Sequence, residues 1–161
     1  MSSERRTLVC SAPGRAGIIG NPTDMYGGAV LSCSVAMRAR ATVTPDRELI
    51  LETNGEECRI ADRDDLRPRG DRFDIARAIL DYMRLPPLAC RLTYESDIPM
   101  RSGLAGSTAL TVALLQSILV WQGEHNNCYQ LAERARHIEL NYLKVVCGYQ
   151  DACMSTYGAV S

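Results

Sequence analysis

The sequence predicts an α+β domain in which a sheet and a set of helices form two layers. Segments with the pattern of strands come early in the chain and segments with the pattern of helices come late, an order typical of this class. A length of 161 residues and a hydrophobic content of 46% are enough for one domain with its own core. We therefore expect residues 1–161 to form a single domain.

The strands are expected where short apolar or alternating runs end at turn residues. A long polar stretch, 54–70, separates the early strands from the first helix and predicts a loop. The predicted strands are Thr7–Ala12, Ala29–Val35, Arg38–Val43 and Cys90–Ser96, with Leu49–Thr53 as the hairpin partner of Arg38–Val43.

Apolar residues that recur at helical spacing predict two helices, Phe73–Met83 and Tyr129–Val146. A third, long apolar helix is expected over Ser107–Trp121, after the glycine-rich turn. The helix over Tyr129–Val146 is predicted to stop before Gly148, because glycine commonly ends helices. Residues 157–161 have the pattern of a turn that leads into a further strand. The sequence therefore predicts a fragment of a longer protein.

Charge and hydropathy exclude several classes of partner. Lys and Arg number 18 against 19 for Asp and Glu, so the net charge of -1 provides no attraction for nucleic acid or an anionic membrane. The apolar stretch near the N-terminus is too short for a signal peptide. The longest apolar run, Ala109–Trp121, is too short and too interrupted to cross a bilayer. We predict a cytoplasmic protein.

The seven cysteines include no Cys-x-x-Cys pair, and the two histidines do not complete a zinc site. A chain without a secretory signal is not expected to carry a disulfide framework. Most of these cysteines are therefore predicted to be small, buried apolar residues.

A glycine-rich turn, 99–109, separates a predicted strand from a predicted apolar helix. Gly103 and Gly106 let main-chain N–H groups approach a ligand, and the free N–H groups of the helix start add the positive end of its dipole. This combination predicts an anion site for a triphosphate, with Ser107 and Thr108 supplying hydroxyls for phosphate or magnesium. The alternative is an ordinary strand–turn–helix junction that Ser107 caps. The spacing fits neither the Walker A loop nor the dinucleotide fingerprint.

Two other segments combine glycines with polar or charged residues. Residues 12–28 contain Arg15, Asn21 and Asp24; without a ligand they are a tight turn with local hydrogen bonds. Residues 138–151 place Glu139 on a helix and Asp151 just after a helix-ending glycine. Without a ligand, Glu139 belongs to a solvated helix face and Asp151 bonds to its own turn.

The three segments, in this order, resemble the motifs of the GHMP kinase family, which includes galactokinase, homoserine kinase, mevalonate kinase and phosphomevalonate kinase. The 99–109 segment is similar to the family's phosphate loop, and the residue inserted between Leu104 and Gly106 is similar to the glucuronokinase branch. In the first segment, Asn21-Pro22 stands where galactokinases have Glu-His. The Gly-x-Gln-Asp string at 148–151, followed by Tyr157-Gly158, resembles heptose and glucuronate kinases.

This resemblance implies a fold like the N-terminal domain of these kinases, which is also that of domain 2 of ribosomal protein S5. It implies an ATP-dependent phosphotransferase that acts on a hydroxyl of a sugar or sugar acid. The family's kinases also carry a C-terminal domain with another glycine-rich motif, which this sequence does not contain. A non-catalytic nucleotide- or sugar-binding fragment, a regulatory relative, and a partner-binding domain are the alternatives.

The resemblance also implies a role for each site residue. Asp151 would be the catalytic carboxylate and Arg15 would stabilise developing charge, while Asn21 and Asp24 would bind the acceptor. Mg²⁺ would be held by Ser107 and Glu139. A missing domain would leave apolar surface exposed and favour self-association. The phosphates of ATP would be bound by Pro99, Gly103, Leu104, Ala105, Gly106, Ser107 and Thr108.

Overall fold

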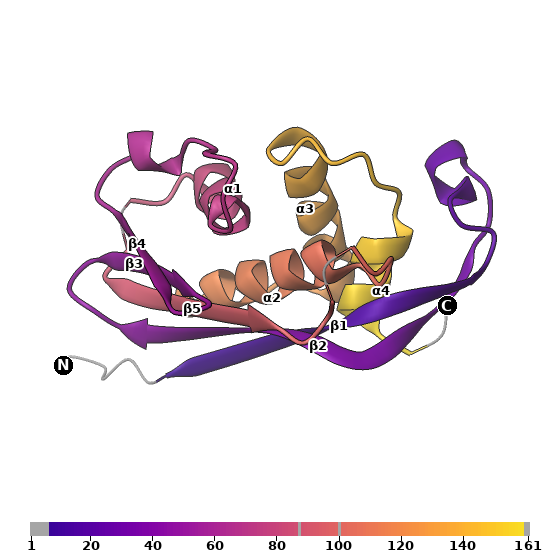
Figure 1. Cartoon of the computed structure of the whole chain (residues 1–161), viewed down its shortest axis with the longest axis horizontal. Helices are drawn as coiled ribbons and strands as arrows, with labels where there is room; N and C mark the ends of the chain where they lie inside the picture. The colour runs from indigo at the N-terminus through magenta and orange to yellow at the C-terminus, as the bar shows by residue number, and fades with distance from the viewer. Residues whose placement is uncertain (1–6, 87, 100, 160–161) are drawn as a thin grey trace.

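The computed structural model describes residues 7–86, 88–99 and 101–159. Its five-stranded sheet has the order β1-β2-β5-β3-β4, antiparallel except for the parallel pair β3 and β5. The four α-helices of the described residues lie on one side of this sheet (Figure 1). The predicted two-layer α+β class is therefore confirmed. The elements are β1 (Leu8–Ile19), β2 (Leu31–Pro45), β3 (Leu49–Thr53), β4 (Glu56–Ile60), α1 (Asp74–Met83), β5 (Cys90–Ser96), α2 (Gly106–Trp121), α3 (Cys128–Asn141) and α4 (Gln150–Tyr157), with short 3-10 helices η1 (Thr23–Tyr26) and η2 (Asp64–Leu66).

The alternation of β2 explains why helices cover one face of the sheet. Ala39, Ala41 and Val43 are buried, whereas the intervening Arg40 and Thr42 are partly exposed. Successive side chains of a strand point to opposite faces, so β2 presents an apolar face to the helices and a polar face to solvent.

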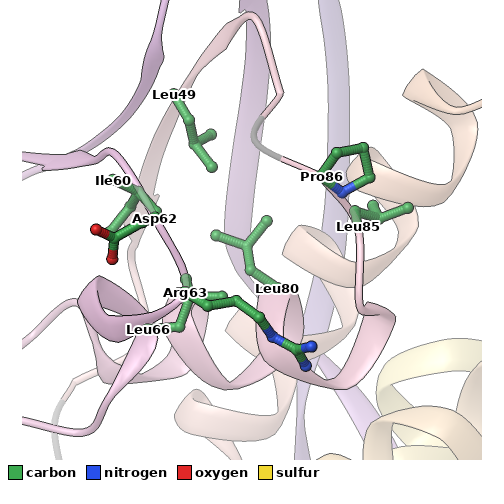
Figure 2. A pocket seen from close by; sticks show the side chains of 8 residues that line it. All are labelled: Leu49, Ile60, Asp62, Arg63, Leu66, Leu80, Leu85 and Pro86. Atoms are coloured by element: carbon green, nitrogen blue, oxygen red, sulfur yellow. The ribbon is translucent and has the colours of Figure 1, made fainter.

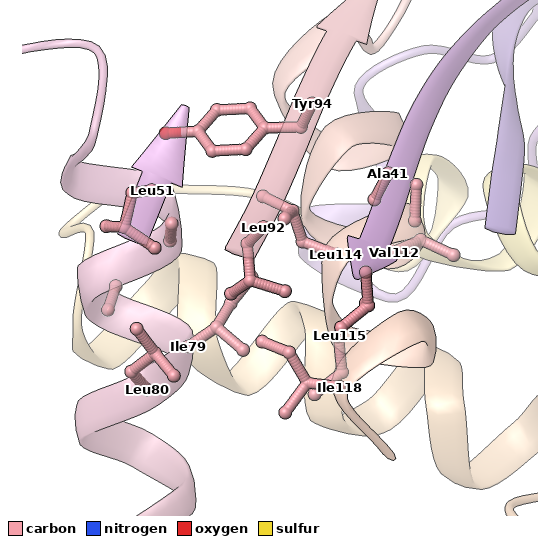
Figure 3. Packing of buried hydrophobic residues seen from close by; sticks show 14 of the residues in the cluster. Ala41, Leu51, Ile79, Leu80, Leu92, Tyr94, Val112, Leu114, Leu115 and Ile118 are labelled. Atoms are coloured by element: carbon pink, nitrogen blue, oxygen red, sulfur yellow. The ribbon is translucent and has the colours of Figure 1, made fainter. Parts of the chain in front are cut away.

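The core lies between the sheet and α2 (Figure 3). Leu114, Leu115 and Ile118 on this helix are fully buried and pack with Leu92 of β5 and Ile79 of α1. Because α2 buries side chains on nearly all of its sides, it has no polar stripe. This central helix begins at the glycine-rich turn, so the core fixes the position of that turn.

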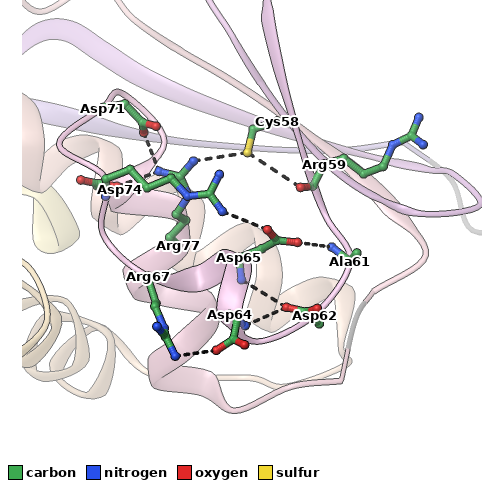
Figure 4. Close-up of polar contacts among 11 residues, drawn as sticks. Cys58, Arg59, Ala61, Asp62, Asp64, Asp65, Arg67, Asp71, Asp74 and Arg77 are labelled. Atoms are coloured by element: carbon green, nitrogen blue, oxygen red, sulfur yellow. Dashed lines mark hydrogen bonds and ion pairs between the residues drawn. The ribbon is translucent and has the colours of Figure 1, made fainter.

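A buried arginine ties α1 to the strand β4 (Figure 4). The guanidinium of Arg77 donates to Asp71 at 2.6 Å and to Asp74 at 2.8 Å, and its other terminal nitrogen donates to the thiol of Cys58 at 3.3 Å. A buried charge is tolerated when it is paired in this way.

The early strands differ from the prediction in extent and pairing. Ala29–Val35 and Arg38–Val43 belong to one long strand, β2. Leu49–Thr53 is a strand, but its predicted pairing with Arg38–Val43 is wrong: it pairs with β4 and β5, and β5 lies between it and β2.

The prediction of a loop over 54–70 is wrong in its first part, because residues 56–60 form β4. Asn54 and Gly55 both have positive φ, of 51° and 76°, and join β3 to β4 as a two-residue hairpin turn. Asn-Gly between two strands is a strong hairpin signal. The hairpin was not predicted because the polar and charged composition of 54–70 is also typical of a loop.

The later elements are largely as predicted. Phe73–Met83, Cys90–Ser96 and Ser107–Trp121 match α1, β5 and α2 to within one residue. The helix predicted over Tyr129–Val146 instead ends at Asn141. Lys144 has a φ of 58°, which interrupts the helix although the apolar spacing continues beyond it.

Burial of the cysteines was also predicted wrongly. Cys90 is buried, Cys128 is exposed, and the other five are half-buried. Separately, none of the helices in the described parts of the chain combines the length and apolar content that a membrane span requires.

Candidate active site

The glycine-rich turn lies directly against β1. The main-chain N–H of Arg15 donates to the carbonyl of Leu104 at 3.0 Å. A Cβ on Gly14 would lie 2.7 Å from the same carbonyl oxygen, closer than real Cβ atoms come. The absence of a side chain at Gly14 therefore permits this contact between the first and second motif segments.

The side chain of Arg15 joins all three motif segments. Its Nη1 donates to the carbonyl of Gly103 at 2.7 Å, and its Nε donates to Oδ1 of Asp151 at 2.6 Å. Its Nη2 also lies against that carboxylate oxygen. Arg15 is only 8% exposed and Asp151 is half-buried, so this charge-assisted pair is partly shielded from water. Asp151 is thus held by a partner 136 residues away, not by its own turn as the alternative supposed.

Asp24 makes a second link between distant segments. Its Oδ2 accepts a hydrogen bond from the main-chain N–H of Gln150 at 3.0 Å. A Cβ on Gly148 would overlap the carboxylate of Asp24, so any side chain at that position would displace this carboxylate. The interpretation of residues 12–28 as a turn with purely local hydrogen bonds is therefore wrong for Asp24, which bonds to the residue that precedes Asp151.

The helix start that follows the turn carries no side-chain cap. Ala105 occupies the N-cap position with a left-handed φ of 56°, and no side chain there accepts a main-chain N–H. Ser107 is exposed and does not cap the helix, in contrast to the alternative interpretation. The first N–H groups of α2 thus remain open to an anion. Gly103 has a φ of 73° and open space where a Cβ would be, whereas a Cβ on Gly106 would press on Ile98 at 3.2 Å.

Glu139 on α3 is 1% exposed, so its interpretation as part of a solvated helix face is wrong. Its Oε1 accepts a hydrogen bond from the hydroxyl of Thr108 at 2.8 Å, and its Oε2 is buried and makes no hydrogen bond of standard geometry within the described residues. Burial raises the pKa of the Glu139 carboxyl to about 7, and the nearby charge of Asp151 adds to the rise. The hydrogen bond also shows that the hydroxyl of Thr108 is directed at Glu139.

The carboxyl group of Glu139 is suited to bind a cation together with a second oxygen ligand. The described residues contain no cluster of three or more His, Cys, Asp and Glu side chains that could enclose a metal. The oxygens that would hold such a cation are Oε2 of Glu139 and the hydroxyl of Ser107 at the start of α2, and Ser107 is close enough to lower the pKa of Glu139. Mg²⁺ typically takes one or two protein ligands and completes its shell with phosphate and water.

The structure also places here four residues that were not predicted as site residues from the sequence. Gln150 donates from its side chain to Ser32 of β2, and both are buried. Gly148 contacts Asp24, as described above. Cys147 lies near Glu139, and burial raises the pKa of its thiol to about 12, which keeps it protonated. Gln150 and Gly148 stand in the Gly-x-Gln-Asp string; no sequence pattern singles out Ser32.

Two predicted residues contribute less. Asn21 is exposed and has no polar contact among the described residues, although its Cβ would lie 3.4 Å from a Cβ placed on Gly17. Pro99 is exposed at the end of the β5 connection, beside a residue outside the described part of the chain.

The pocket of Figure 2 lies at another part of the sheet and includes none of the motif residues. It is lined by Leu49, Ile60, Asp62, Arg63, Leu66, Leu80, Leu85 and Pro86.

Comparison with known proteins agrees with this geometry. Residues 73–159 match the family model described as the GHMP kinases N terminal domain, and residues 2–45 match the galactokinase galactose-binding signature. The heptose 7-phosphate kinase of Campylobacter jejuni is 28% identical over 95% of this chain and 49% of its own length. The galactokinase of Chloroflexus aurantiacus is 27% identical over 94% of this chain and 41% of its own length. This chain therefore spans about half the length of these relatives, or less.

The fold is shared with solved structures as well. The mevalonate kinase of Methanococcus jannaschii superposes with a TM-score of 0.82 at 15% identity, over 96% of this chain and 52% of that one. The fold and the site define an α+β domain with a glycine-rich turn at the start of its central helix. The chain belongs to the GHMP kinase family, as its motifs indicated.

Proposed function

We propose that this chain is the nucleotide- and acceptor-binding part of an ATP-dependent kinase that phosphorylates a hydroxyl of a sugar or sugar acid. The observation that carries the proposal is the single guanidinium of Arg15, which bonds both to the glycine-rich turn at Gly103 and to Asp151. A phosphate-binding turn and a carboxylate suited to an attacking hydroxyl are thereby held together. Membership of a kinase family supports this assignment.

In the proposed reaction, the uncapped N–H groups at the start of α2 bind the phosphates of ATP. Phosphoryl transfer relies mainly on positioning and on neutralisation of charge. Gly103 keeps the turn open toward the ligand, since nothing lies within 4 Å of its missing Cβ.

Magnesium would be held by Ser107 and the free oxygen of Glu139 together with the phosphates. When bound, it supplies positive charge that stabilises the transferring phosphoryl group.

Asp151 accepts or orients the proton of the acceptor hydroxyl. Arg15 keeps that carboxylate in place through two nitrogens, and its remaining terminal nitrogen fixes the turn. Its positive charge also lies close to where negative charge develops during transfer.

The acceptor would bind beside Asp24. One of its oxygens is taken by the N–H of Gln150, so the other is available for an acceptor hydroxyl, with Asn21 at the exposed rim. The relatives are named for heptose phosphate, galactose and mevalonate. We add glucuronic acid, because Gly20-Asn21-Pro22 is similar to glucuronokinases.

The test is ADP release from Mg·ATP in the presence of each of these four acceptors, with Asp151→Asn as the control. The proposal expects turnover with one sugar or sugar acid, and its loss in the variant. Mg·ATP and acceptor binding without any ADP release would instead identify a non-catalytic binding relative. Absence of Mg·ATP binding would overturn the proposal.

A further inference from the structure

We infer that Gln150 is a positioning residue that fixes Asp24 and Asp151 relative to each other. The inference rests on the proposed function, in which Asp24 binds the acceptor and Asp151 contacts its reacting hydroxyl. Gln150 itself reaches neither the acceptor hydroxyl nor the phosphates in this scheme; it acts through its two neighbours.

Gln150 uses both its side chain and its main chain to bond to distant segments. Its Nε2 donates to Oγ of Ser32 on β2, and its main-chain N–H donates to Oδ2 of Asp24 at 3.0 Å. Gln150 and Ser32 are 5% and 1% exposed. Hydrogen bonds in such dry surroundings are strong and directional, so they define where Gln150 lies.

The first turn of α4 has no other capping device. Tyr149 occupies its N-cap position, and no side-chain cap is present there. The start of this helix is instead held against the sheet by two bonds. Gln150 bonds to Ser32 on β2, and Asp151 bonds to Arg15 on β1. The backbone of Gly17 on β1 closes over the same amide, since a Cβ there would lie 3.2 Å from Nε2 of Gln150.

Because Gln150 and Asp151 are consecutive, a shift of Gln150 moves the catalytic carboxylate and the N–H that orients Asp24 together. Removal of the Gln150 side-chain bond should therefore disturb two carboxylates on different segments. A residue that only contributes stability would lower the melting temperature without disturbing either.

The experiment uses Gln150→Met, which keeps the volume but removes the amide, and Ser32→Ala, which removes its acceptor. Gln116→Met on the exposed side of α2 and Ser117→Ala in the buried core are the matched controls. The first readout is the ¹³C carboxyl resonance of Asp24 and of Asp151 in the free chain. Both resonances should move in the two test variants and in neither control.

The second readout is steady-state kinetics with the acceptor that is turned over. Both test variants should lose about 10–100-fold in kcat, the size expected from a small misplacement of reacting groups, while KM for Mg·ATP stays unchanged. The double variant should be no worse than either single one, because both remove the same hydrogen bond.

Unmoved carboxyl resonances in Gln150→Met and Ser32→Ala, with only a lower melting temperature, would overturn the inference. The same spectra test the role of Gln150 even if the protein releases no ADP. Such a protein would count against the proposed function, whereas the position of the two carboxylates would still be measured.

Discussion

At the scale of single residues, the buried carboxyl of Glu139 predicts an unusual pH dependence of stability. Its pKa is raised from 4.5 to about 7 in the folded chain, so between these values the folded state binds more protons than the unfolded state. The free energy of unfolding of the metal-free chain should therefore fall as the pH rises from about 4.5 to about 7. Because each unit of pKa shift corresponds to a fixed free energy, the free energy of unfolding should fall by at most ~3 kcal/mol.

Urea unfolding at pH 5 and pH 8, in a chelating buffer, measures this effect. Glu139→Gln should remove most of the fall and be the more stable protein at pH 8. Glu133→Gln, on the same helix, is the control and should keep the wild-type dependence. Equal pH dependence in Glu139→Gln and wild type would show that this carboxyl does not titrate as described.

Gly148 provides a second residue-scale prediction. In Gly148→Ala the new methyl group would occupy the space of the Asp24 carboxylate, which must move away from the main chain of Gln150. We expect acceptor affinity to fall by about 10-fold or more, the loss that follows from ~1.4 kcal/mol or more of misplaced contact. Gly70→Ala strains a positive φ far from the site and should lower stability alone. Equal acceptor affinity in Gly148→Ala and wild type would contradict the role of Asp24.

At the scale of elements, α3 depends on a capping box at its start. The side chain of Asn127 accepts from the N–H of Gln130, and the side chain of Gln130 accepts from the N–H of Asn127. Asn127→Ala should lower the free energy of unfolding by about 1 kcal/mol. Asn126→Ala, next to it, has no such role and should leave stability nearly unchanged. Equal losses in the two variants, measured by urea unfolding, would contradict the box.

The element scale also shows what the sequence could and could not predict. The apolar periodicity of α1, the long apolar run of α2 and the alternation of β5 are local signals, and these elements were predicted to within one residue. The end of α3 was not, because the apolar spacing continues beyond Asn141, where the helix ends, and past Lys144, whose φ is left-handed. The helix α4 was missed because it has low amphipathicity and starts without a cap.

At the scale of the whole molecule, α2 holds the helix layer on the sheet and positions the glycine-rich turn. Leu114 is fully buried on this helix among residues of the sheet and of α1. Leu114→Ala should lower the free energy of unfolding by about 2–5 kcal/mol, through lost burial and a residual cavity. Val120→Ala, on the exposed side of the same helix, should cost much less. Thermal unfolding of both variants compares them, and similar melting temperatures would contradict the central role of α2.

The composition of the site was predictable from the sequence, but its internal contacts were not. The motif spacing placed Arg15, Asp24, Glu139 and Asp151 in one family pattern. Contacts between residues more than 100 positions apart leave no local signal in the sequence. The hydrogen bond of Gln150 to Ser32 and the close contact of Gly148 with Asp24 are therefore seen only in the fold.

The most direct test of the central claim is to compare turnover and nucleotide binding in Asp151→Asn. If the three segments form one phosphoryl-transfer site, the variant should lose about 10³-fold or more in kcat, a loss of ~4 kcal/mol in transition-state stabilisation. Its affinity for Mg·ATP should match that of the wild type, because the glycine-rich turn is unchanged. Turnover that persists in Asp151→Asn would contradict the assignment of Asp151 as the catalytic carboxylate.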